Sequence, residues 1–526
     1  MNNPHENDSK ASHSQPREHS HKEIMVIMSG LMTGILLAAL DQTVVSTALK
    51  SIVEEFNGLS HYTWVVTAYL LTSTAVTPLY GKVSDIYGRR PVYIFSIVTF
   101  LLGSFLAGAA TSMTQLIAFR ALQGVGAGGL FALSFIIIGD IVSPRDRGKY
   151  QGLFGAVWGV SSVAGPLLGG FFADRGEILG VTGWRWIFYI NLPFGIIALL
   201  VTMAVLHVPR PNLKHRIDYL GALFMVISVT ALLLGISVTG PTDGWLHPYT
   251  LAYFTGAIVF ALLFLWWESK VDEPILPLRL FRNHTFSLTS AIAFVIGAGM
   301  FGAIVLLPLY MQVNLQYTPS EAGIRLLPMT LGIVSMAITS GRLISKTGKY
   351  KRFPVAGLIV LMVAVVLFTT IHRDMPYWQL AIYSMIMGMG VGLAMQTIVI
   401  ALQNDVEYRD MGVATSSNTF FRSLGASFGT AIFGTVLTDR FITEISGSLP
   451  AGTTQDSVAA VTENTQLIAT LPVEVQSVIF DSFDRAFSFV FWIALPIIVI
   501  GFLLTIRLRE KPLREGIDRS ASEAAG

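Results

Sequence analysis

Long apolar runs recur along this chain, and they constrain its fold more than any other feature. The first, Ile24 to Leu49, is almost unbroken, and further runs of about twenty residues follow it, separated by short polar turns. A helical run of this length matches the thickness of a bilayer core. Only 13% of the 526 residues are charged, whereas a soluble domain carries about a quarter. The chain is therefore predicted to be an all-α, polytopic membrane protein.

Fourteen runs are interpreted as membrane spans. They cover residues 24–49, 61–80, 91–110, 114–139, 149–173, 184–206, 217–239, 248–268, 286–313, 321–341, 353–371, 377–402, 412–437 and 486–507. Lys and Arg indicate the orientation, because they are enriched on the cytoplasmic side. With the N-terminus inside, 26 of the 35 Lys and Arg residues fall in inner segments and 6 in outer ones. We therefore expect an inner or plasma membrane location, with both termini in the cytoplasm.

Two pairs of similar segments indicate internal repetition. Gly81–Arg89 after the second span resembles Gly341–Lys349 after the tenth, and Arg145–Gly148 resembles Arg409–Gly412, at offsets of 260 and 264 residues. Near-equal offsets predict two parallel six-span halves, with a substrate site between them. The predicted parts are a disordered cytoplasmic tail (1–23), an N-terminal bundle (24–206), a linker with two accessory spans (207–285), a C-terminal bundle (286–507) and a second cytoplasmic tail (508–526). The C-terminal bundle includes an external segment (438–485), in which a small helix (465–483) is expected to rest on the membrane surface or on the fold.

Asp41 lies inside the first apolar run, where a carboxylate is costly and is retained for a reason. It lies about 16 residues, or roughly 24 Å, from the inner end of a core about 30 Å thick. Arg120 lies at the same level within one helical turn, and it is the only cation there in the N-terminal half. We predict that Arg120 keeps Asp41 ionised, and that separation of the helices favours protonation. The alternative is a static ion pair that sets helix register.

Asp41 is the one clear acid in the predicted spans, whereas three arginines, Arg120, Arg325 and Arg422, fall inside them. A cationic substrate would therefore compete directly with the proton at Asp41. The excess of arginine has two interpretations. The arginines either bind backbone carbonyls, or the cavity accepts neutral, zwitterionic or anionic amphiphiles. For Arg422, near the midplane, a hydrogen bond to a glycine-rich neighbouring helix stands beside a role in substrate binding.

Several motifs carry a family resemblance. They are Gly81–Pro91 (GKVSDIYGRRP), Arg120–Gly129 (RALQGVGAGG), Gly155–Gly170 (GAVWGVSSVAGPLLGG) and Trp184–Gly195 (WRWIFYINLPFG). With them, residues 24–507 resemble the major facilitator superfamily, and within it the fourteen-span drug:proton antiporters of the EmrB/QacA type. The resemblance implies two six-helix bundles with two extra transmembrane helices between them. It also implicates Asp41 and Arg120 in proton coupling.

The resemblance assigns two further groups of residues. A cytoplasmic gate, which latches the cytoplasmic side in the outward-open state, would comprise Gly81, Asp85, Gly88, Arg89, Arg90 and Arg147. Asp85 is expected at a helix N-terminus of the other half, and Ser345 replaces it in the second copy. The antiporter motif, associated with exporters, would comprise Gly155, Gly159, Gly165, Pro166, Gly169 and Gly170. Physically, these glycines predict close helix packing, and the proline predicts a bend.

The substrate cavity is predicted from polar and aromatic residues at suitable depth, namely Gln42, Thr43, Gln123, Trp158, Phe301, Tyr310, Asn418 and Arg422. The 18 Met and 33 Phe residues suit a pocket that repacks around varied ligands. The predicted function is proton-coupled export of lipophilic or amphiphilic compounds by alternating access, with no enzymatic activity. The alternatives are a dedicated exporter of an endogenous lipid, peptide or antibiotic and, from another class, a membrane sensor or scaffold. The resemblance of the Gly165–Pro166 motif to that of the exporters implies that the protein is not an importer.

The expected partners are protons, small lipophilic substrates and the lipid bilayer, without nucleic acid. The absence of cysteine excludes thiolate metal sites and disulfides. No Walker-type Gly-rich lysine loop is present, so ATP is not the expected energy source. No cofactor or metal is predicted. The sequence leaves the oligomeric state open, and a monomer is the working expectation.

Overall fold

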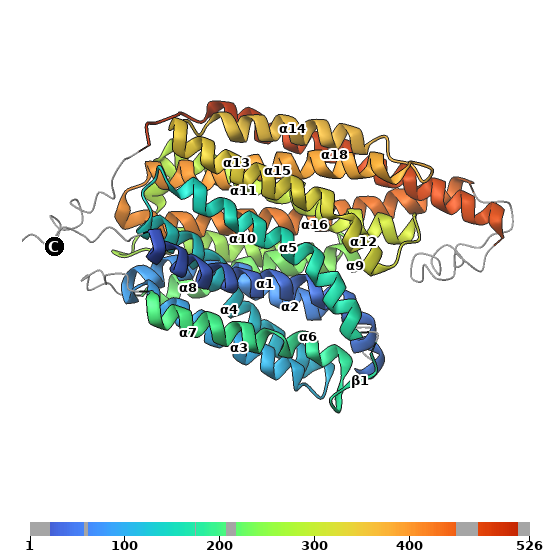
Figure 1. Ribbon diagram of the computed structural model, residues 1–526, viewed down its shortest axis with the longest axis horizontal. Coiled ribbons are helices and arrows are strands. Elements are labelled where there is room, and N and C mark those ends of the chain that lie inside the picture. Colours follow the sequence, from blue (N-terminus) through green and yellow to red (C-terminus); the bar gives the residue numbers. More distant parts are fainter. Residues whose placement is uncertain (1–20, 57–61, 174, 207–216, 449–471, 514–526) are drawn as a thin grey trace, which may run out of the picture.

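The computed structural model describes residues 21–56, 62–173, 175–206, 217–448 and 472–513, and nearly all of them are helical (Figure 1). The first helices are α1 (His21–Phe56), α2 (Tyr62–Tyr87), α3 (Arg89–Gly108), α4 (Met113–Ile141), α5 (Arg147–Ala173), α6 (Trp186–Tyr189) and α7 (Asn191–Val205). A short antiparallel hairpin connects α5 to α6 through β1 (Glu177–Ile178), β2 (Val181–Thr182) and the turn η2 (Gly183–Arg185).

The later elements are also helices. The middle of the chain forms α8 (Tyr219–Leu234), η3 (Gly235–Thr239), α9 (Gly240–Asp243), α10 (Pro248–Glu268) and η4 (Leu278–Arg282). The last part forms α11 (His284–Val313), α12 (Pro319–Arg325), α13 (Leu327–Thr347), α14 (Arg352–Phe368), α15 (Tyr377–Asp405), η5 (Tyr408–Asp410), α16 (Met411–Ser448) and α18 (Val473–Arg507).

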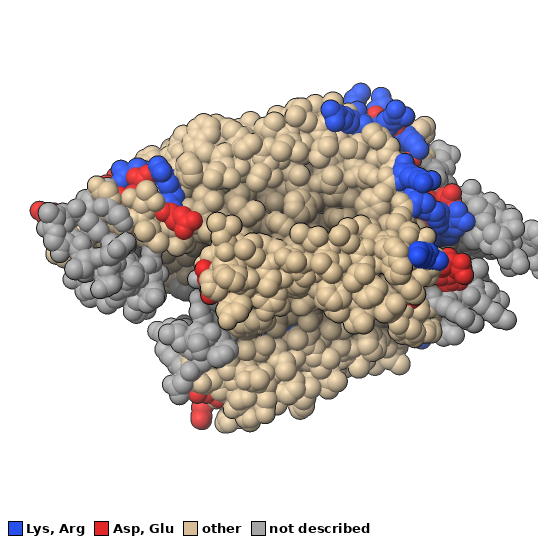
Figure 2. Space-filling model, turned by 180° about the vertical axis from the view of Figure 1, so that it is seen from behind, with Lys and Arg blue, Asp and Glu red and all other residues tan. Residues whose placement is uncertain are grey.

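Eleven helices in the described part of the chain are long and apolar enough to cross a membrane, and two shorter apolar helices accompany them, His284–Gly299 and Arg352–Phe368. α2 is as long as the others but more polar, since threonine and serine recur along it. Figure 2 shows the charged side chains gathered at the two ends of the molecule, with a wide uncharged belt between them. Because such a belt matches a hydrocarbon core, the chain is a multi-pass membrane protein.

The helices form two groups that lie side by side, with α1 to α7 in one and α11 to α18 in the other (Figure 1). Each group has its own buried apolar core, which includes Tyr93 and Phe100 in the first and Leu361 and Phe487 in the second. α8 and α10 pack against each other, and α8 also contacts α2. The two groups meet where α5 packs on α12 and α13, and where α2 and α4 pack on α16.

The groups approach most closely at one end of the molecule. We call this the termini end, because His21 and the chain after Arg507 lie there, and we call the opposite end the far end (Figure 1). At the termini end, a Cβ atom added to Gly341 would lie 2.0 Å from the carbonyl oxygen of Gly148. Only glycine allows two helix backbones to approach so closely.

The prediction of a separate external helix over residues 465–483 is wrong where the structure describes it. Residues from Val473 onward already belong to α18, which runs on without a break to Arg507, while 449–471 lie outside the described residues. α16 likewise extends past the predicted end of its span, to Ser448. The polar residues there pair with each other. Glu444 of α16 forms ion pairs with Arg440 of the same helix, at 2.6 Å, and with Arg485 of α18, at 2.9 Å.

Candidate functional site

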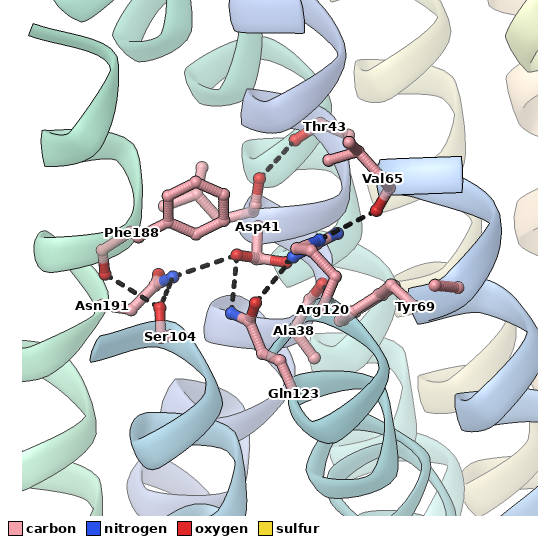
Figure 3. Close-up of polar contacts among 12 residues, drawn as sticks. Ala38, Asp41, Thr43, Val65, Tyr69, Ser104, Arg120, Gln123, Phe188 and Asn191 are labelled. Atoms are coloured by element: carbon pink, nitrogen blue, oxygen red, sulfur yellow. Dashed lines mark hydrogen bonds and ion pairs between the residues drawn. The ribbon is translucent and has the colours of Figure 1, made fainter. Parts of the chain in front are cut away.

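Asp41 lies at the centre of a buried polar cluster in the first group of helices (Figure 3). The residue is 1% exposed, and its Oδ2 atom forms an ion pair with Nη1 of Arg120 from α4. Its Oδ1 atom accepts hydrogen bonds from Gln123 Nε2 at 2.8 Å and Asn191 Nδ2 at 3.1 Å. The depth argument thus predicted the contact with Arg120 correctly, whereas Asn191 of α7 was not predicted as a partner.

Arg120 is itself held from several sides. Its Nε atom donates to the carbonyl oxygen of Val65 at 3.1 Å, and Nη1 donates to Gln123 Oε1 at 2.7 Å. The guanidinium also lies over the Tyr69 ring, 4.2 Å from its centroid, and the Tyr69 hydroxyl donates to the Ala38 carbonyl of α1. Removal of one partner from a buried ion pair leaves the other charge uncompensated, so this cluster is sensitive to any change of charge.

The Asp41 cluster adjoins a large cavity between the two groups of helices. The cavity has a volume of about 1100 Å³ and is lined from both groups. Gln42, Thr43 and Tyr69 lie on its wall, next to Asp41, but Asp41 itself does not. The expectation that a cationic substrate competes directly at Asp41 therefore fails for this conformation, because the Asp41 carboxylate is enclosed by its own partners.

Four of the predicted cavity residues lie on the wall, namely Gln42, Thr43, Trp158 and Arg422. Three predicted cavity residues do not, because their side chains are buried and bonded elsewhere. Gln123 binds Asp41, the Tyr310 hydroxyl donates to Asp484 at 2.6 Å, and Asn418 Nδ2 donates to the Thr289 carbonyl at 3.0 Å. The side chain of Phe301 lies outside the described part of the structure.

The cavity opens toward the far end. It follows α16 from Thr419 to Asp439, which is roughly 30 Å along the helix axis. Leu49 and Ser51, near the far end of α1, also line it. Sequence reasoning missed the Ser73, Thr74 and Thr77 face of α2, although hydroxyl groups repeated along an otherwise apolar helix were an available signal.

The predicted gate residues lie at the termini end, where the two groups are in contact. Gly81 packs on the backbone of Gly412 at the start of α16, and the Asp85 carboxylate lies beside the same glycine. Asp85 thus sits at a helix N-terminus of the other group, as predicted, where the helix dipole favours a negative charge. Arg89 Nη1 lies 2.5 Å from Asp85, and Arg89 Nε lies 2.6 Å from Asp140.

The other gate residues bind backbone. Arg147 donates to the carbonyls of Val142, Gly139 and, across the interface, Gln403, at 3.0, 2.5 and 3.3 Å. Arg90 donates to the Met203 carbonyl at 2.5 Å. Gly88 has a φ of 92°, which explains the need for glycine between α2 and α3.

The second copy of the gate motif, Gly341–Lys349, also contacts the opposite group of helices at the termini end. Ser345, which replaces the acid, donates to the Arg145 carbonyl at 2.6 Å, and Arg145 Nε donates to the Ser345 carbonyl at 3.1 Å. Both copies therefore contact the opposite group of helices, and the cavity is closed at this end.

The glycines of the predicted antiporter motif lie along α5, which runs between α1 and the second group. Gly155 faces Ala337 and Gly159 faces Thr330 of α13, while Pro166 contacts Gly323 of α12. Further along α5, Gly165 packs against Thr43, Gly169 is buried and Gly170 lies near Ser320. α5 thus connects the helix that carries Asp41 to the opposite half.

Asp41 is not the only buried acid, which corrects the sequence-based view. In the C-terminal half, Asp484 is 9% exposed and accepts hydrogen bonds from Tyr310, Asn314 and the backbone N–H of Arg373. Asp140, Asp218 and Glu268 are also buried. None of them lines the cavity. Asp218 caps α8 and accepts from Trp267 Nε1 at 2.9 Å, which accounts for its place at the start of that helix.

Two groups of membrane helices around a cavity that is closed at one end are typical of a membrane transporter. The family model of the Major Facilitator Superfamily matches residues 31–430, and the chain belongs to that superfamily of transporters, which are not enzymes. The multidrug transporter protein MdtP of Bacillus subtilis is 38% identical over 83% of this chain and 80% of its own length. Multidrug resistance protein 3 of the same organism is 34% identical over 90% of this chain and 93% of its own.

Solved structures support the same fold. The proton:xylose symporter XylE, bound to 6-bromo-6-deoxy-D-glucose, superposes with a TM-score of 0.60 over 96% of this chain and 100% of its own. At 15% identity, this similarity concerns the fold alone.

Proposed function

We propose that this protein is a proton-coupled antiporter that exports lipophilic or amphiphilic compounds by alternating access, in a fourteen-span arrangement. The observation that supports this most directly is the position of Asp41, which is enclosed by Arg120, Gln123 and Asn191 and is one residue from the cavity wall. A proton on Asp41 would break the ion pair without entering the substrate space. The relatives with multidrug names support export.

The proposed coupling passes through α1 and α5. Protonation of Asp41 removes the attraction that holds Arg120 to α1. α1 is joined to α5, because Thr43 Oγ1 donates to the Ser161 carbonyl at 3.1 Å and Gly165 packs on Thr43. α5 in turn packs on α12 and α13, so a shift of α1 is transmitted to the interface between the halves. Each pH unit of gradient supplies about 1.4 kcal/mol per proton to this change.

The proposed orientation places the termini end in the cytoplasm of the cell, with six-helix bundles at 24–206 and 286–507 and the accessory helices between them. Lys and Arg cluster at the termini end (Figure 2), which supports this orientation. The cavity of this conformation would then face outward.

The proposed orientation can be tested by thiol labelling, because the chain lacks cysteine. The two variants are Ser269→Cys at the termini end and Asp374→Cys at the far end, and both positions are exposed. Only Asp374→Cys should react with an impermeant thiol reagent on intact cells.

The proton role of Asp41 is tested in proteoliposomes with an imposed pH gradient. Asp41→Asn should bind a neutral lipophilic dye as the wild type does, but should no longer accumulate it against the gradient. Asp374→Asn, an exposed acid in a far-end loop, is the matched control and should transport normally. Full gradient-driven accumulation by Asp41→Asn would exclude this acid as the proton carrier.

A second candidate is a dedicated exporter of one endogenous lipid, peptide or antibiotic. The arginine on the cavity wall favours it, because a fixed charge discriminates among substrates. A competition screen with chemically diverse compounds separates the two, since a dedicated exporter would respond to one narrow chemical class.

A further inference from the structure

Arg422 is a buried arginine on the wall of the central cavity. It lies on α16, about eleven residues or roughly 17 Å from the start of that helix, and its residue is 8% exposed. Its backbone is fixed, because Gly297 of α11 packs directly on the Arg422 carbonyl. The guanidinium is thus positioned deep in the membrane, on the C-terminal side of the cavity.

Among the residues that the structure describes, Arg422 forms no hydrogen bond and no ion pair. Its guanidinium carbon lies 5.5 Å from the centre of the Phe135 ring of α4, across the interface between the halves. Arg120 and Arg147 are also buried, but each has polar partners. Arg120 pairs with a carboxylate, and Arg147 donates hydrogen bonds to three carbonyls. The backbone-binding role considered for Arg422 from the sequence is therefore not realised.

An unpaired buried guanidinium is unfavourable. Arginine keeps its positive charge in proteins, and loss of hydration without a compensating partner destabilises it strongly. A distant aromatic ring compensates only a small part of that loss. The position of this charge is therefore better explained by a ligand group that binds in the cavity than by packing within the protein.

The remaining wall does not supply a negative charge near Arg422. The charged residues on the described wall are Arg422 and Asp439. Asp439 is exposed, and it follows Arg422 by seventeen residues on the same helix, or roughly 25 Å. Most of the other wall residues are apolar or carry a hydroxyl group, including Leu70, Phe131, Trp158 and Met329.

We propose that Arg422 binds the acidic group of an anionic amphiphile, whose apolar body occupies the rest of the cavity. A planar guanidinium binds a carboxylate, sulfonate or phosphate oxygen pair with two parallel hydrogen bonds. The cavity volume of about 1100 Å³ accommodates a compound of drug size. The proposal names the substrate class of the proposed exporter and rests on that function. It makes Arg422 a specificity-determining residue.

The test uses three matched probes with one fluorescent body. They are 11-(dansylamino)undecanoic acid, its uncharged amide and the corresponding amine, and their binding to the purified full-length protein in nanodiscs is measured at equilibrium. The wild type should bind the acid about tenfold or more tightly than the amide, and the amine most weakly. Arg422→Gln should lose the preference for the acid and bind the amide within about threefold of the wild type.

Arg422→Lys keeps a positive charge but lacks the planar guanidinium, so it should retain part of the preference for the acid over the amide. This variant separates the effect of charge from that of guanidinium geometry. Equal binding of acid and amide by the wild type, or an unchanged preference in Arg422→Gln, would overturn the proposal. The wild-type comparison decides the question even if Arg422→Gln does not fold.

This experiment is independent of the proton coupling. Binding is measured without a pH gradient, whereas the function of Asp41 is detected only as gradient-driven accumulation. If the acid binds through Arg422 but a pH gradient does not drive its transport, the proposal of proton coupling is overturned and the proposed anion site is supported. If a pH gradient drives export of a neutral dye but the wild type does not bind the acid more tightly than the amide, the proposed anion site is overturned and proton coupling is supported.

Discussion

Thr43 of α1 and Gly165 of α5 are in direct contact, and a Cβ atom added to Gly165 would lie 2.1 Å from the Thr43 hydroxyl oxygen. This contact lies two residues from Asp41 and one residue from Pro166. It joins the buried acid to the helix that packs on the opposite half. The glycine motif of α5 is thus a mechanical connection, since its small residues let α5 pack closely on both sides.

Gly165→Ala should therefore impair transport more than stability. The added methyl group pushes α1 from α5 and weakens the hydrogen bond from Thr43 to Ser161, so we expect at least a tenfold loss of gradient-driven transport, or about 1.4 kcal/mol. Gly256→Ala in α10 is the control, because nothing lies within 4 Å of its Cβ position. Transport by both variants at the wild-type rate would show that the contact is unimportant.

Gly341→Ala should weaken closure of the termini end. The methyl group would clash with the backbone of Gly148, where neither helix has a flexible side chain that could move away. Spin labels introduced by Lys149→Cys and Lys346→Cys, both exposed, lie on the two sides of this contact. Pulsed electron resonance should report a longer and broader distance distribution in the Gly341→Ala protein. An unchanged distribution would contradict the role of the glycine pair.

Asp484→Asn should destabilise the protein without abolishing coupling. The Asp484 carboxylate accepts three hydrogen bonds that tie α18 to α11 and to the loop before α15. Loss of its charge should cost about 1–3 kcal/mol, measured as a lower midpoint of thermal unfolding in detergent. Proton-driven transport should persist at permissive temperature. Loss of coupling in a folded Asp484→Asn protein would mean that a second acid carries the proton.

Asn191→Ala tests the unexpected partner of Asp41. The amide of Asn191 donates to Asp41 and is itself positioned by Ser104, through a hydrogen bond of 3.0 Å. Without this donor, the Asp41 carboxylate loses one of the hydrogen bonds that hold it in place beside Arg120. Gradient-driven transport should fall by about tenfold, because a buried hydrogen bond to a charged group is lost. Ser162→Ala in α5 removes a hydroxyl that bonds only within its own helix, and this control should transport at nearly the wild-type rate.

Several features follow from the sequence because they depend on local patterns. Hydrophobic length predicts the membrane helices, and counting residues along two helices places Asp41 and Arg120 at one depth. The glycines of α5 predict close helix packing, because they have no side chain to keep a neighbouring helix at a distance. These inferences need only the rise of a helix and the thickness of a membrane.

The tertiary structure alone decides which way each side chain faces. Gln123 and Tyr310 have the polarity and depth of cavity residues, yet packing rotates both toward buried acids. Arg422 instead faces the cavity, and no described residue forms a hydrogen bond or ion pair with it. The extension of α18 to Val473 likewise depends on its contacts with α16 and α11. Helix rotation and register are set by contacts between residues far apart in the chain, which hydropathy and motif spacing do not record.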